Sequence, residues 1–253
     1  MEKLILTIML FTLISIVWGR AILFLAKNKI FKRLCFMVMG KVSYEFEQVH
    51  SFLLGLVYVL VFVLGALILS IIFEFNVFLY LPLKNKYIPY VFVGIMAELS
   101  LSGLIVAFMF MFFPKINWIN QIENIPWIES IKYVPNRKGF LIPLIGAFCE
   151  EVFFRGYIYI ILRTDFFEYG VAFALIVSSL LFALQQTLNT NNYIQGIGML
   201  SGSIAIGAIG CLLIELSGSL LPALVAHEAY VIFYFRQIEP GNKRKYVSYM
   251  DSP

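Results

Sequence analysis

Residues 51–73 read SFLLGLVYVLVFVLGALILSIIF and contain no charged side chain. A transmembrane helix needs about 20 consecutive apolar residues, because each residue advances about 1.5 Å through a hydrocarbon core about 30 Å thick. The backbone N–H and C=O groups inside that core must be satisfied within the protein, and a helix satisfies them within one segment. Residues 51–73 are therefore predicted to form a membrane-spanning helix.

Six other apolar stretches of similar length occur along the chain. The seven predicted spans together are residues 4–26, 51–73, 87–113, 138–162, 169–188, 194–216 and 218–236. Very short connections join the last four spans, so these helices are expected to be antiparallel neighbours. The sequence thus predicts an all-α fold, a multi-pass transmembrane helical bundle of about seven spans.

The overall composition indicates the same class of protein. Of the 253 residues, 61% are hydrophobic and 13% are charged, and the mean hydropathy is +0.88. Soluble domains contain about 45–50% apolar and about 25% charged residues, and disordered chains are more polar still. Three cysteines stand far apart without a CxxC motif, which favours buried thiols over a disulfide framework or a zinc site. They are Cys35, Cys149 and Cys211.

The basic residues predict the topology. The formal net charge is +4, and 13 of the 19 Lys and Arg residues lie in three connections, residues 27–50, 114–138 and 236–253. The positive-inside rule therefore predicts an outside N-terminus and a cytoplasmic C-terminus. The expected location is the cell membrane, with membrane lipid as a partner, and part of residues 28–49 is expected to lie on the membrane surface as an amphipathic helix. The sequence contains no nucleic-acid-binding motif, and it leaves the oligomeric state open.

The fourth span contains the densest group of ionisable residues. Residues 149–156 read CEEVFFRG, which contains the pattern EExxxR. An ionisable residue at hydrocarbon depth costs about 2.5–3.5 kcal/mol, so such residues are functional candidates. On a helix Glu151 and Arg155 can pair at i,i+4, whereas Glu150 is rotated by about 100° and is free to face a cavity. We interpret Glu151 with Arg155 as structural and Glu150 as the available acid or base; the alternative is that all three only join helices through ion pairs.

Two later spans carry further polar residues. The fifth ends in SSLLFALQQ (178–186), and the seventh contains PALVAHEAYV (222–231) with His227. A lone histidine in an apolar stretch is more often a packing residue than a ligand, but its presence in one bundle with EExxxR favours a functional role.

Other polar and small residues in the spans have weaker signals. Glu98, Glu215 and Arg20 are expected to pair or to reach the interface. Gly198 and Gly202 form a GxxxG motif, which is typical of close helix packing.

These segments, in this order, resemble the CAAX protease and bacteriocin-processing (CPBP or Abi) family of intramembrane endopeptidases. The family signatures are EExxxR, FxxxH, and HxxxN or HxxxD, on separate helices of a four-helix core. The first is matched in full. The second begins at Phe182 and has Gln186 in place of histidine, and the third begins at His227 and has Val231 in place of Asn or Asp. The resemblance covers residues 138–236, under half of the chain.

The resemblance implies a domain organisation. N-terminal membrane helices and connections occupy residues 1–137, the Abi-type catalytic core occupies residues 138–236, and a cytoplasmic tail occupies residues 237–253.

The resemblance also implies the roles of individual residues. Glu150 is expected to activate water, and His227 is expected to stabilise the oxyanion. Gln186 is expected to hold a water or a hydrogen bond, but an amide cannot take up a proton. The full expected site consists of the catalytic group Glu150, Glu151, Arg155, Gln186 and His227, with Phe182 and Val231 as substrate contacts.

Three functions remain open from the sequence. The first is an intramembrane endopeptidase that hydrolyses a membrane-associated or lipidated peptide, or a membrane-protein substrate, with no metal or cofactor, because one histidine of a three-ligand zinc site is missing. The second is a catalytically impaired relative that acts by binding, in bacteriocin self-immunity or in regulation of a partner. The third, a transporter or channel component, is disfavoured because no internal repeat and no paired broken helices occur.

Overall fold

The structure is a computed structural model that describes residues 1–42, 44–82, 84–131 and 141–237. Within these ranges the chain is helical and contains no strand. The longer helices are α1 (Glu2–Lys27), α2 (Lys29–Met39), α3 (Phe46–Phe73), α4 (Pro89–Phe112), α8 (Leu141–Glu150), α10 (Gly170–Thr187), α11 (Tyr193–Ser217) and α12 (Leu221–Gln237). The shorter ones are α5 (Trp118–Glu123), α6 (Pro126–Ile131), α9 (Ile160–Asp165), the 3-10 turns η1 (Val77–Tyr80), η2 (Asn85–Tyr87) and η4 (Phe167–Tyr169), and the π-helix η3 (Glu151–Tyr159).

The predicted all-α, multi-pass helical bundle is confirmed. Among the described residues, five helices are long and apolar enough to cross a membrane. The other two predicted spans also correspond to helices: α8, η3 and α9 follow one another without a break, and α12 is a shorter apolar helix. Each predicted span therefore coincides with a helical segment.

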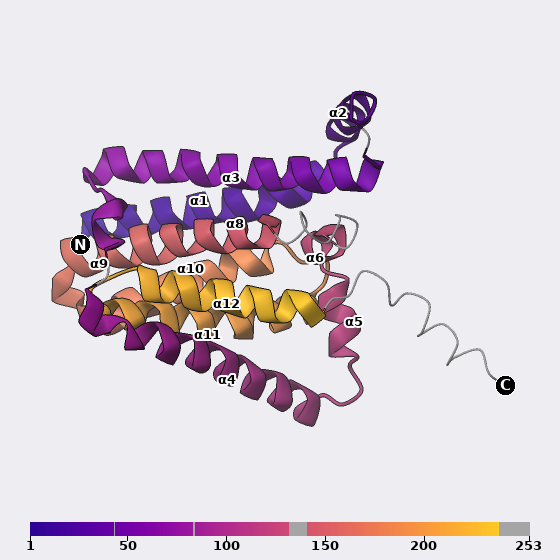
Figure 1. Cartoon of the computed structure of the whole chain (residues 1–253). Helices are drawn as coiled ribbons and strands as arrows, with labels where there is room; N and C mark the ends of the chain where they lie inside the picture. The colour runs from indigo at the N-terminus through magenta and orange to yellow at the C-terminus, as the bar shows by residue number, and fades with distance from the viewer. Residues whose placement is uncertain (43, 83, 132–140, 238–253) are drawn as a thin grey trace.

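The long helices lie side by side along a common axis (Figure 1). In that view α1 and α3 form one side of the bundle, α4 forms the opposite side, and α8, α10, α11 and α12 lie between them. Helices α2, α5 and α6 gather at one end, and α9 lies at the other end beside the N-terminus. The connections that carry α2 and the α5–α6 pair, which the sequence predicts on one side of the membrane, thus share one end of the molecule.

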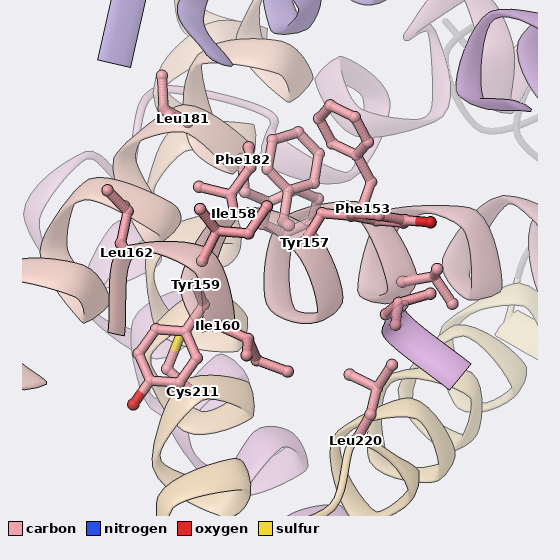
Figure 2. Close-up of a cluster of buried hydrophobic side chains, with 14 of the residues drawn as sticks. Phe153, Tyr157, Ile158, Tyr159, Ile160, Leu162, Leu181, Phe182, Cys211 and Leu220 are labelled. Atoms are coloured by element: carbon pink, nitrogen blue, oxygen red, sulfur yellow. The ribbon is translucent and has the colours of Figure 1, made fainter. Parts of the chain in front are cut away.

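One continuous hydrophobic core joins the N-terminal helices to the later ones. Trp18 of α1 is fully buried and packs against Phe153 and Phe154 of η3, with ring centroids 5.3 Å and 5.9 Å away. Figure 2 shows how side chains of η3 and α9 gather with residues of α10 and α11, including Phe182 and Cys211. The predicted division at residues 137/138 falls outside the described residues, as do residues 238–253 of the predicted tail.

Helix α2 lies in the segment where the sequence predicts a helix on the membrane surface, and its place on the membrane stays a prediction. Its first turn is capped by Asn28, whose side-chain oxygen accepts hydrogen bonds from the backbone N–H groups of Ile30 and Phe31. Phe31 and Cys35 are buried against α1 and α3, and the opposite face exposes apolar side chains between basic ones. Burial raises the pKa of the Cys35 thiol.

Helices α10 and α11 are in close contact at Gly207. A Cβ atom there would lie 2.8 Å from Ser179 Oγ and 3.0 Å from Ser179 Cα, so only glycine fits. The expected contact through Gly198 and Gly202 is wrong in detail: a Cβ at Gly202 would meet nothing within 4 Å, and one at Gly198 would only touch Met109 at 3.6 Å. Sequence spacing alone did not indicate which glycines face the partner helix.

Other predictions for isolated residues can be compared directly with the structure. Cys35, Cys149 and Cys211 are free and buried, as expected. Glu215 forms an ion pair with Arg163 at 3.1 Å. The further basic residues used for the topology, in the ranges 132–140 and 238–253, lie outside the described residues.

Candidate active site

Side chains from three parts of the chain, namely the continuous segment α8–η3, α10 and α12, meet inside the bundle. Glu150 ends α8, and Glu151 and Arg155 follow in η3. Gln186 comes from the last turn of α10, and His227 comes from α12. The structure thus brings together all five residues of the expected catalytic group, although Gln186 and His227 are far from the EExxxR motif in the chain.

Glu151 connects two of these residues through one oxygen. Glu151 Oε1 lies 3.3 Å from an Arg155 guanidinium nitrogen, and the two side chains are 0% exposed. The same oxygen lies 2.8 Å from His227 Nδ1. A carboxylate on one ring nitrogen fixes the orientation of an imidazole and leaves the other nitrogen free for a separate partner. Glu151 therefore orients His227, and Arg155 compensates the buried charge of Glu151.

Glu150 has a different set of partners. Its Oε1 accepts a hydrogen bond from Gln186 Nε2 at 2.6 Å and another from the Tyr58 hydroxyl. Its Oε2 lies 3.9 Å from His227 Nε2, which is too far for a direct hydrogen bond but within reach of one bridging water. The Glu150 side chain is 13% exposed, whereas Glu151 is fully enclosed. Glu150 is the carboxylate with one oxygen available for chemistry.

The local helix type differs from the one assumed for the motif. The spacing of Glu151 and Arg155 predicts an i,i+4 pair on an α-helix, and the structure forms that pair within the π-helical segment η3. π-helical turns inside α-helices are rare and frequently lie at functional sites. Sequence spacing therefore identified the contact but not the backbone that makes it.

The two expected substrate contacts lie in different surroundings. Phe182 is 2% exposed, and its ring lies 4.2 Å from the Arg155 guanidinium carbon and 6.0 Å from the His227 ring. Val231 is partly buried, one helical turn beyond His227. The ring of Phe182 thus packs within the site, and the substrate roles of both residues stay predictions.

Sequence reasoning missed Tyr58, and the expectation that Glu98 pairs or reaches the interface is wrong. The Tyr58 hydroxyl reaches Glu150 from α3, and Gln185 Nε2 donates to that hydroxyl at 3.2 Å. The sequence signal that could have indicated Tyr58 is a tyrosine in a largely apolar span, because a buried phenol needs a hydrogen-bond partner. Glu98 of α4 is 1% exposed and interacts electrostatically with His227, and neither of its oxygens has a hydrogen-bond partner.

The described residues contain no cluster of side chains that could bind a metal ion. Among residues 1–131 and 141–237, apart from 43 and 83, no cluster of three or more His, Cys, Asp and Glu side chains is arranged to hold a metal ion. The expectations of no metal and no cofactor stay predictions.

Comparison with known proteins gives one family match, which covers part of the chain. Residues 137–233 match the family model described as type II CAAX prenyl endopeptidase Rce1-like. No curated protein and no solved structure matches the chain. The matched segment contains η3, α10, α11 and nearly all of α12, the helices that carry most of the site. It covers under half of the chain and agrees with the family indicated by the sequence motifs. Residues 137–233 of this chain are thus similar to the Rce1-like family of type II CAAX prenyl endopeptidases.

Proposed function

We propose that this protein is an intramembrane endopeptidase in which Glu150 activates a water molecule to hydrolyse a peptide bond. The observation that carries the proposal is the 3.9 Å separation of Glu150 Oε2 and His227 Nε2. A water beside this pair, within hydrogen-bond distance of both atoms, can donate a hydrogen bond to the carboxylate and contact the imidazole. General bases are placed in this way, within hydrogen-bond reach of the proton that they remove.

The proposed reaction has two steps. Glu150 Oε2 takes a proton from the water while the water oxygen attacks the carbonyl carbon, which produces a tetrahedral intermediate with a negatively charged oxygen. His227 in its imidazolium form donates from Nε2 to that oxygen and from Nδ1 to Glu151, because both ring nitrogens then carry protons. Glu150 returns the proton to the peptide nitrogen, the C–N bond breaks, and an acid and an amine are released.

Gln186 and Val231 are expected to lower the rate of peptide hydrolysis. Gln186 donates a hydrogen bond to Glu150, but its amide cannot accept a proton as the family's histidine can. Val231 has no donor for the oxyanion, and one such donor is worth about 10²–10³ in rate. General acid–base assistance is worth about 10²–10⁴. Turnover is therefore expected to be slow and to increase when His and Asn are introduced at these positions.

The proposed substrate is a membrane-associated peptide, with a lipidated C-terminal peptide as the first choice. The description of the matched family names a prenyl endopeptidase, which supports a lipid-modified substrate. Glu150 lies about 14 Å along the helix from Leu141, close to half the thickness of a bilayer core. A peptide anchored by its own lipid can be held near a site at that depth.

The test is peptide cleavage by the purified, detergent-solubilised protein. Lipidated and unmodified peptides of the same sequence are incubated with wild type, Glu150→Gln and Glu215→Gln, with and without a chelator, and products are identified by mass spectrometry. Glu215 is the matched control, since it is a carboxylate of the bundle that pairs with Arg163 instead of with the site.

Wild type and Glu215→Gln are expected to cleave at equal rates, and Glu150→Gln is expected to lose at least about 100-fold. Cleavage that persists in Glu150→Gln would contradict the glutamate mechanism, and loss of activity in the chelator would contradict the metal-independent one.

The second candidate is a catalytically impaired relative that acts by binding a peptide or a partner protein. The presence of Gln186 and Val231 beside an intact EExxxR motif favours it. In that case wild type and Glu150→Gln are equally inert, whereas the double variant Gln186→His, Val231→Asn gains cleavage. If the double variant is also inert on the same panel, two hypotheses fail for these substrates: the active endopeptidase and the catalytically impaired relative.

A further inference from the structure

Tyr58 connects the N-terminal helices to the site. It lies on α3, outside residues 137–233, and its hydroxyl donates to Glu150 Oε1. The direction of this bond is fixed by a third residue: Gln185 Nε2 donates to the Tyr58 oxygen at 3.2 Å. A phenol has a single O–H, so with its oxygen already accepting a hydrogen bond, its proton is directed at the carboxylate.

The ring of Tyr58 is held in place by packing. Its centroid lies 4.8 Å from that of Trp18, which is fully buried and in turn packs against Phe153 and Phe154. An aromatic side chain has few rotatable bonds, so a packed ring fixes the position of its hydroxyl closely. The hydroxyl therefore meets Glu150 at a position set by α1, α3 and η3 together.

The two oxygens of Glu150 have different surroundings as a result. Oε1 receives donors from Tyr58 and Gln186, whereas Oε2 faces His227 across 3.9 Å. Two donors on one oxygen hold the plane of the carboxylate and stabilise its ionised form. Rotation of the carboxylate would break both bonds, so Oε2 remains directed at the gap.

We propose that Tyr58 is a positioning residue, which holds Glu150 so that Oε2 faces the water-binding gap. This inference rests on the proposed hydrolytic function for its effect on rate, but the contact itself can be tested separately. It also implies that residues 138–236 alone form an incomplete site, because one of the two donors to Glu150 comes from α3.

The experiment compares Tyr58→Phe with Tyr157→Phe in the full-length protein. Both changes remove one hydroxyl and keep the ring. Tyr157 is the matched control because its hydroxyl also joins η3 to α3, through a 2.8 Å hydrogen bond to Ser70, away from Glu150. Two readouts are used: the kcat and KM of peptide cleavage, and the rate at which Glu150 is modified by a hydrophobic carbodiimide, which reacts with protonated carboxyl groups and is followed by mass spectrometry.

In Tyr58→Phe we expect kcat to fall roughly 10- to 100-fold with KM unchanged, since a hydrogen bond to a charged group has been lost. Modification of Glu150 is expected to become several-fold faster, because the ionised carboxylate has lost a donor. Tyr157→Phe is expected to match wild type in both measurements.

Each outcome decides one of the two proposals. An unchanged kcat in Tyr58→Phe overturns the positioning role, whatever the labelling shows. If wild type cleaves no peptide, the proposed function fails, and the labelling rate alone then decides whether Tyr58 holds Glu150: an unchanged rate overturns the inference. Equal changes in Tyr58→Phe and Tyr157→Phe would also overturn it, because they would reflect a general loosening of α3 against η3.

Discussion

The guanidinium of Arg155 is a cation with no exposed surface in the centre of an apolar bundle. Its ion pair with Glu151 and the ring of Phe182 beneath it are the contacts that balance its transfer from water. Breaking a buried ion pair by removing one partner leaves an uncompensated charge and costs about 3–5 kcal/mol. The buried pair therefore does not by itself indicate a high stability. Removal of either partner alone is nevertheless expected to lower the free energy of unfolding.

Arg155→Met is therefore expected to lower the free energy of unfolding by about 3–5 kcal/mol, measured by thermal unfolding in detergent. The matched control is Arg163→Met, which breaks the pair with Glu215. Because the Arg163 side chain is 37% exposed, this change is expected to cost at most about 1 kcal/mol. Equal losses in the two variants would show that burial of the Arg155 pair has no energetic consequence.

At the scale of the element, the π-helical segment η3 is enclosed on every side. All nine of its residues are buried. Gly156 lies at its centre, where a Cβ atom would overlap a methyl group of Val77 and lie 3.3 Å from Leu220. The absence of a side chain at this position lets η1 and Leu220, the residue before α12, pack against the segment that carries Glu151 and Arg155.

Gly156→Ala is expected to destabilise the protein by about 1–3 kcal/mol, because an added methyl group in a filled core forces its neighbours to move. Gly202→Ala in α11 is the control, since a Cβ there meets nothing within 4 Å. In that variant alanine is expected to be neutral or slightly stabilising, by up to about 1 kcal/mol, through its higher helix propensity. Thermal unfolding measures both changes, and a neutral Gly156→Ala would contradict the described packing.

At the scale of the whole molecule, the grouping of connections agrees with the distribution of charge. The connections that carry α2 and the α5–α6 pair are rich in basic residues and lie at the same end of the bundle (Figure 1). The positive-inside rule predicts that this end lies in the cytoplasm. With the seven spans predicted from the sequence, the N-terminus is then predicted on the opposite side.

Fusion proteins test this arrangement in a bacterial host. A green fluorescent protein attached after Pro253 is expected to be fluorescent, and alkaline phosphatase attached after Lys86 is expected to be active, because each reporter works on one side of the membrane only. The reciprocal fusions serve as controls and are expected to be silent. Activity of the phosphatase at the C-terminus would contradict the topology and the odd number of spans.

The sequence by itself determined the helical segments and the contact within the EExxxR motif. The predicted span 51–73 lies within α3 (Phe46–Phe73), and 194–216 corresponds to α11 (Tyr193–Ser217). Both follow from local rules: an apolar stretch of bilayer length forms a helix, and residues one turn apart become neighbours. Glu151 and Arg155 accordingly pair as the spacing predicts.

The tertiary structure decided which residues of different helices meet. It directed Tyr58 at Glu150, brought Glu151 to His227, and placed Gly207 of α11 against Ser179 of α10. A span that is apolar on most of its surface carries little information about its rotation or its neighbours, because either face can lie against lipid or protein. Those choices depend on the packing of side chains from several helices at once, so no single stretch of sequence contains them.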